Sequence, residues 1–125
     1  MKKDSENLIV VKSKAFALRS IKLYKFLIEE KREFVLSKQF LRSATSVGAN
    51  VREAIRGQSN ADFGAKMNIA LKEASEAEYW LELLHESEYI NNEISLELLN
   101  DCQELIRILT AVVKTTFDQS KRDSY

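Results

Sequence analysis

Apolar residues recur every three or four positions along most of this chain of 125 residues, a spacing that is typical of amphipathic helices. The repeat predicts four helices, over residues 13–31, 37–56, 60–87 and 92–118. We expect Ser37 to cap the second helix, Gly57 to mark its end, and Ser59 to cap the third. Because the connections are short, consecutive helices should pack antiparallel. The pattern therefore predicts an all-α protein, an antiparallel up-down four-helix bundle that occupies residues 1–125 as one domain.

The amino-acid composition agrees with long helices and favours a cytoplasmic location. The chain has no proline, and 45% of its residues are hydrophobic and 30% charged, as expected for uninterrupted helices. The single cysteine, Cys102, excludes an internal disulfide and fits a reducing cytoplasm. The first residues are too polar for a signal peptide, and no run approaches the roughly 18 apolar residues of a membrane helix. We therefore expect a cytoplasmic protein that has no membrane partner.

The segment RSATSVGANVREA, residues 42–54, concentrates weak helix formers inside the second predicted helix. At about 100° per residue, the apolar residues of this helix share one face and its basic residues lie opposite. A stripe of small and hydrogen-bonding residues lies between these faces: Gln39, Ser43, Ser46, Asn50, Glu53 and Gly57. Such a stripe indicates that another helix or a second subunit approaches closely, with polar groups paired across the contact.

The third predicted helix offers partners for that stripe. Its residues Glu73, Glu76 and Trp80 lie together on one side, about a quarter turn from its own apolar face. We expect Arg42 or Arg52 of the second helix to form a charge-assisted pair with one of these two glutamates.

Charge is distributed unevenly, although the net charge is zero. Residues 1–72 carry 15 Lys and Arg against 7 Asp and Glu, a net +8, whereas residues 73–125 carry 4 against 12, a net −8. This division fits either a basic surface that binds nucleic acid or helices whose charges complement one another when packed. The candidate nucleic-acid-binding residues are Lys38, Arg42, Arg52, Arg56 and Lys66, assisted by Lys22 and Lys25.

Catalytic and metal-binding patterns are weak. Glu82 and His85 have the Glu-x-x-His spacing of a helical metal site, but such a site needs a second copy of the motif, and His85 is the only histidine. We interpret His85 as a polar residue near a helix end. Cys102 shares core spacing with Leu98 and Leu105, so we interpret it as a buried hydrophobe and not a nucleophile. We expect no enzymatic activity, no catalytic residue, no metal and no cofactor.

The motifs LSKQFLRSATSVGANVREA and ADFGAKMNIALKEASEAEYWLELL resemble a bacterial four-helix-bundle family, named for proteins encoded in intervening sequences of 23S rRNA genes. The likeness extends over about residues 12–117. Its most specific positions are Gln39, Arg42, Ser43, Ser46, Asn50, Glu53, Phe63, Ala70, Glu73, Tyr79, Trp80 and Leu81. The resemblance implies a bundle that assembles into a ring-like homopentamer. A related branch, the accessory proteins of diversity-generating retroelements, binds nucleic acid and partners a reverse transcriptase, and this chain differs from it in having zero net charge.

Two hypotheses about function follow. In the first, the protein is a homo-oligomeric nucleic-acid-binding accessory, and its basic residues contact phosphates of RNA or DNA. In the second, it is an assembly or scaffold module that binds a protein partner without nucleic acid, and its charges meet those of neighbouring subunits. Ile69, Trp80 and Leu83 lie away from the apolar face of the third helix, so either hypothesis predicts self-association, as a pentamer by the resemblance.

Overall fold

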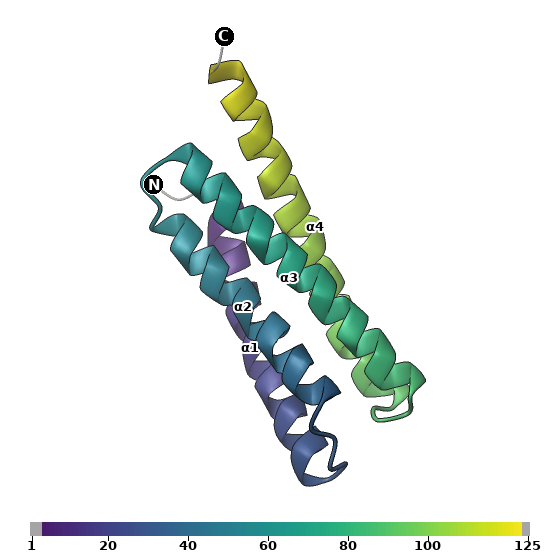
Figure 1. Cartoon of the computed structure of the whole chain (residues 1–125). Helices are drawn as coiled ribbons and strands as arrows, with labels where there is room; N and C mark the ends of the chain where they lie inside the picture. The colour runs from purple at the N-terminus through teal and green to yellow at the C-terminus, as the bar shows by residue number, and fades with distance from the viewer. Residues whose placement is uncertain (1–3, 124–125) are drawn as a thin grey trace.

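A computed structural model describes the backbone of residues 4–123 and the side chains of residues 8–119 and 121. Four helices make up this part of the chain: α1 (Asp4–Glu29), α2 (Leu36–Ile55), α3 (Asn60–Glu86) and α4 (Asn92–Asp123). Each helix packs against the next and runs in the opposite direction, and α4 returns to contact α1 (Figure 1). The predicted all-α class with four helices is confirmed, with the up-down order of a bundle.

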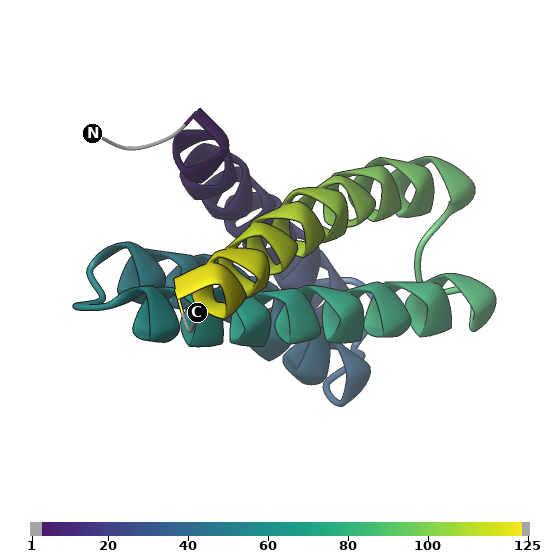
Figure 2. The same ribbon diagram turned by 90° about the horizontal axis from the view of Figure 1, so that it is seen from above.

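Each helix contacts two others around the bundle, and the contact between α1 and α4 is the least extensive. Over the described residues, α1 shares no contact with α3, and α2 shares none with α4, so these pairs lie diagonally across the molecule. Figure 2 shows α1 and α4 crossing at a wide angle, whereas consecutive helices accompany each other over much of their length. Because α1 and α3 both run against α2, they point in the same direction (Figure 1).

The predicted bounds of the middle helices differ from the observed ones by one residue at most, but the first helix begins well before residue 13. It starts at Asp4, and Ile9 is fully buried seven residues before Phe16, so the apolar repeat continues into the first turns. The fourth helix likewise extends past residue 118 to Asp123, where no glycine or proline interrupts it.

The core lies along the inward faces of all four helices. Its largest fully buried side chains are Phe16, Phe40, Ile9, Leu27, Met67, Leu81, Leu84, Leu105 and Leu109. The rings of Phe16 and Phe40 meet edge to face, with centroids 6.4 Å apart and planes at 86°, an arrangement that adds to simple burial. Small core residues of α3, including Ala70, Ala74 and Ala77, allow close helix packing.

Glu33 caps the start of α2, although the sequence did not predict it as a cap. The carboxylate of Glu33 accepts hydrogen bonds from the backbone N–H groups of Val35, Leu36 and Ser37 at 3.1, 3.0 and 2.6 Å. Ser37, which we expected to be the cap, lies inside the helix, and its hydroxyl donates to the carbonyl of Glu33. At α3 the predicted cap is confirmed, since the Ser59 hydroxyl accepts from the N–H of Asp62 at 3.1 Å.

None of the described helices combines the length and the apolar composition needed to cross a membrane.

Candidate functional site

The most connected polar cluster lies between α2 and α3. Arg42 donates through one terminal nitrogen to Glu73 at 2.9 Å and through the other to Glu76 at 2.6 Å. The indole N–H of Trp80 donates to the same Glu76 oxygen at 3.2 Å. The expected pairing of Arg42 with these glutamates is therefore confirmed. For Arg52, the other candidate, no described carboxylate lies within 4.0 Å.

This cluster changes the ionisation of its members. The hydrogen bond from Arg42 lowers the pKa of Glu76, and the bond from Trp80 acts in the same direction, against the opposing effect of burial. The hydrogen bond to Glu76 raises the pKa of Arg42. Half of the Arg42 side chain remains exposed (51%), so solvent screens the pair and its main effect is to fix the register of α2 against α3.

Ser43, Ser46 and Asn50 of the α2 stripe do not pair across a helix contact within this chain, whereas Glu53 of the same stripe lies 3.8 Å from Lys66 of α3. The buried Ser43 hydroxyl donates to the carbonyls of Gln39 and Phe40, and Ser46 donates to the carbonyl of Arg42. The amide of Asn50 donates to the carbonyl of Ser46. For these three residues the expected pairing with another helix of the chain was wrong, because short polar side chains inside a helix satisfy themselves on backbone carbonyls three and four residues earlier. A contact of the stripe with a second subunit stays a prediction.

A close helix approach does occur in this segment, but toward α1. A Cβ atom built on Gly48 would lie 3.4 Å from the Ser13 hydroxyl oxygen and 3.6 Å from the Ser13 carbonyl oxygen. Ser13 is itself buried. The glycine in RSATSVGANVREA therefore allows the backbones of α1 and α2 to approach each other.

The candidate basic residues differ in their availability. Arg42 is held by two glutamates, and the Lys66 ammonium lies 3.8 Å from the carboxylate of Glu53. The other three, Lys38, Arg52 and Arg56, are exposed, and no carboxylate in residues 8–119 lies within 4.0 Å of them. Lys14 and Arg52 line a groove of about 290 Å³ between α1 and α2, whose floor includes small residues such as Ala17 and Gly48.

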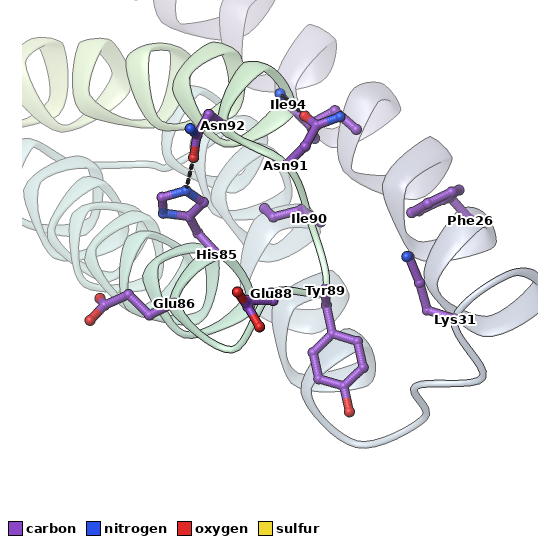
Figure 3. Close-up of a pocket in the computed structure, with 10 residues that line it drawn as sticks. All are labelled: Phe26, Lys31, His85, Glu86, Glu88, Tyr89, Ile90, Asn91, Asn92 and Ile94. Carbon is purple, nitrogen blue, oxygen red and sulfur yellow. Dashed lines mark hydrogen bonds between the residues drawn. The ribbon is translucent and has the colours of Figure 1, made fainter.

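A second polar concavity, of about 540 Å³, lies at the turn from α3 to α4 (Figure 3). It is lined by Phe26, Lys31, His85, Glu86, Glu88, Tyr89, Ile90, Asn91, Asn92 and Ile94. Figure 3 shows His85 and Asn92 pointing toward each other, and a ring nitrogen of His85 lies 2.6 Å from the Asn92 side-chain oxygen. Within the described residues, no three His, Cys, Asp or Glu side chains gather closely enough to hold a metal ion.

The exposed apolar side chains include some that the sequence predicted and others that it did not. Ile69 is 42% exposed on α3, as expected, but Trp80 is half-buried against the core and Leu83 is also only partly exposed. A larger set lies on α1: Leu8, Val11, Leu18 and Ile21. This set could have been predicted from the sequence. Val11, Leu18 and Ile21 are spaced by seven and three residues, which places them on the side of α1 opposite its core residues.

The helix order, the core and the Arg42 cluster define a small all-α protein of the four-helix-bundle class. The chain belongs to the 23S rRNA-intervening sequence protein family, whose sequence profile matches residues 5–111. The resemblance inferred from the α2 and α3 motifs is thereby confirmed.

A solved structure agrees with this assignment. The chain is similar to a crystal structure of a protein with unknown function from the S23 ribosomal protein family of Bacteroides thetaiotaomicron VPI-5482. The two share 54% sequence identity, with a TM-score of 0.86, and the match covers 88% of this chain and 98% of the other. No curated protein matches this chain.

Proposed function

We propose that this protein is a non-enzymatic helical-bundle protein that assembles with copies of itself, as a pentamer, and binds RNA through the exposed basic side of α2. The family description names a ribosomal RNA, and the Bacteroides neighbour is described as a member of a ribosomal protein family. These descriptions support RNA as the nucleic acid to test first.

One observation carries the proposal: three exposed cations lie on the outward side of α2 with no described carboxylate near them. Lys38, Arg52 and Arg56 fall within a narrow arc of the helix at about 100° per residue. The row extends over 19 residues, roughly 27 Å at a rise of 1.5 Å per residue. Lys14, across the α1–α2 groove, adds a fourth charge beside Arg52. A row of this kind fits contacts with successive phosphates, which give affinity without base specificity.

Ion pairs occupy several of the basic residues outside this row. Several other basic residues of the first two helices are paired with acidic residues of the second two: Lys12 with Glu104, Arg19 with Asp101, and Arg42 with Glu73 and Glu76. Arg42 therefore contributes to the helix contact, and the proposed RNA surface comprises Lys38, Arg52 and Arg56.

The test is a titration of a short single-stranded RNA with the parent and with an Arg52→Gln, Arg56→Gln variant. Loss of two phosphate contacts should weaken binding to unrelated RNA sequences alike and reduce the slope of log K against log salt by roughly one to two. The matched control is Arg107→Gln with Lys114→Gln, which removes two exposed charges from α4 and should leave binding nearly unchanged. Equal binding by parent and α2 variant would refute the proposal.

A scaffold that binds a protein partner without nucleic acid is the second candidate. The exposed apolar residues of α1 favour it, because such a surface is suited to a protein partner. A parent that forms an oligomer by light scattering but binds no RNA at low salt would select this candidate.

A further inference from the structure

Helix α1 is apolar on two opposite sides. Its inward side places Ile9, Phe16 and Leu27 in the core. On its outward side Leu8, Val11, Leu18 and Ile21 are 43%, 66%, 59% and 36% exposed. A helix that is covered on one side only normally presents polar residues to water on the other. The outward side of α1 therefore has the composition of a contact surface.

The charges beside this apolar stripe are basic. Lys14, Lys22 and Lys25 are exposed on the same side of α1, and no described carboxylate lies within 4.0 Å of them. A complementary partner surface should therefore combine apolar residues with acidic ones.

The outward side of α3 has that combination. Tyr79 is 54% exposed, and Glu82 and Glu86 are exposed further along the same side. Ile69, 42% exposed, lies at the edge of this side toward α2, in the row that includes Glu73 and Glu76. Since α1 and α3 lie diagonally across the bundle and share no contact among the described residues, the two surfaces of one chain cannot cover each other.

The two surfaces also match in length and order. Val11 to Lys25 and Lys72 to Glu86 are each 15 residues long, about 21 Å of helix. In a parallel register Leu18 faces Tyr79 and Lys25 faces Glu86. Lys72, which also lies on this side of α3, then falls opposite Val11, where its aliphatic stem can pack.

From this match we infer that the outer face of α1 docks in parallel on the outer face of α3 of a second copy. The inference rests on the proposed self-association and specifies its surface. Because the two faces differ and lie on opposite sides of the chain, the contact is head-to-tail, and repetition closes a ring when the rotation between copies permits. The parallel direction agrees with such a ring, since rotation about an axis along the bundle preserves the direction of every helix. The outward side of α2 stays available for RNA.

The first test compares two exposed leucines by sedimentation or light scattering. Leu18→Gln should raise the dissociation constant of the oligomer about tenfold or more, with unchanged helix content by circular dichroism. Leu96→Gln is the matched control, because Leu96 is 61% exposed on α4, and its oligomer should match the parent's. Equal masses for both variants and the parent across the dilution series would overturn the inference.

The second test exchanges charges. Lys22→Glu with Lys25→Glu, and separately Glu82→Lys with Glu86→Lys, should each weaken the oligomer, because each places like charges across the contact. A chain that carries all four changes should regain most of the parent's affinity. Failure of the combined chain to recover, when both pairs weaken assembly, would overturn the pairing of α1 with α3.

These outcomes separate the inference from the proposal on which it rests. A parent that sediments as a 14.4 kDa monomer at micromolar concentration refutes self-association and, with it, the inferred interface. A parent that forms an oligomer unaffected by both sets of changes refutes the α1–α3 interface alone. RNA binding is tested at Arg52 and Arg56, which none of these variants changes, and it is measured independently.

Discussion

Gly48 of α2 faces Ser13 of α1 at a distance that leaves room for one methyl group and little more. The nearest atom to a Cβ at Gly48 is the Ser13 hydroxyl oxygen, at 3.4 Å, which is ordinary van der Waals contact. Gly48→Ala should therefore increase the free energy of unfolding by about 0.5–1 kcal/mol, because alanine has the higher helix propensity. Gly48→Leu should destabilise the fold by about 1–3 kcal/mol through overpacking. Denaturation midpoints measure both changes.

Gly64 is the matched comparison for that prediction. A Cβ at Gly64 would lie 2.8 Å from the Cγ2 atom of Thr116, and the Thr116 hydroxyl already donates to the carbonyl of Val112. Gly64→Ala should thus stabilise less than Gly48→Ala or should destabilise, since the stiff threonine must move. A larger gain at Gly64 than at Gly48 would contradict this account of the two helix contacts.

The sequence predicted α2 and α3 well because local signals mark their ends. Gly57 follows α2, and Ser59 caps α3 through the N–H of Asp62. It predicted the start of α1 poorly, since a helix start without such a signal depends on burial of Ile9 in the folded core. In the turns after α1 and α3, Arg32 and Glu88 adopt positive φ angles of 53° and 67°, where glycine or asparagine would be expected.

The candidate site was likewise predicted only in part. Periodicity identified the α2 stripe and the Arg42 partners, because helical spacing determines which residues share a face. It did not identify the close approach to α1 at Gly48, which lies on the side of α2 away from the stripe. Spacing also does not distinguish bonds within a helix from bonds between helices, as Ser43 and Ser46 show.

Glu33 should contribute to stability as the cap of α2. Burial favours a higher pKa, but hydrogen bonds from the N–H groups of Ser37, Leu36 and Val35 outweigh it, and the pKa of Glu33 is lowered. Glu33→Ala leaves these donors without an acceptor in a largely buried place and should cost about 1–3 kcal/mol. Urea denaturation at neutral pH measures the loss. A cost below about 0.5 kcal/mol would mean that water replaces the carboxylate, and Glu30→Ala, at an exposed position nearby, provides the control.

The Arg42 cluster predicts a specific dependence of stability on pH. The pKa of Glu76 is lowered in the folded chain, so its contribution is present above the ordinary glutamate pKa of about 4.3 and is lost as the pH falls through the folded value. Glu76→Gln should therefore reduce the loss of stability between about pH 5 and 3. A double-mutant cycle with Arg42→Gln should give a coupling of about 0.5–1 kcal/mol at neutral pH, because the pair is partly exposed. A coupling near zero would show that Arg42 does not fix the α2–α3 register.

Cys102 should be chemically inert while the protein is folded. Burial raises the pKa of its thiol to about 12, and the nearby charges of Glu78 and Asp101 act in the same direction. The thiol also donates to the carbonyl of Ala74 at 3.2 Å. Because the thiolate is the reactive form, a maleimide or disulfide reagent at pH 8 should modify Cys102 only as fast as the helices open. Labelling should become rapid in denaturant.

The control is an Asn100→Cys, Cys102→Ser variant, whose exposed thiol on α4 should react at once in the folded protein. Equal labelling rates for parent and variant under native conditions would show that α3 and α4 separate readily, and that Cys102 does not belong to a closed core.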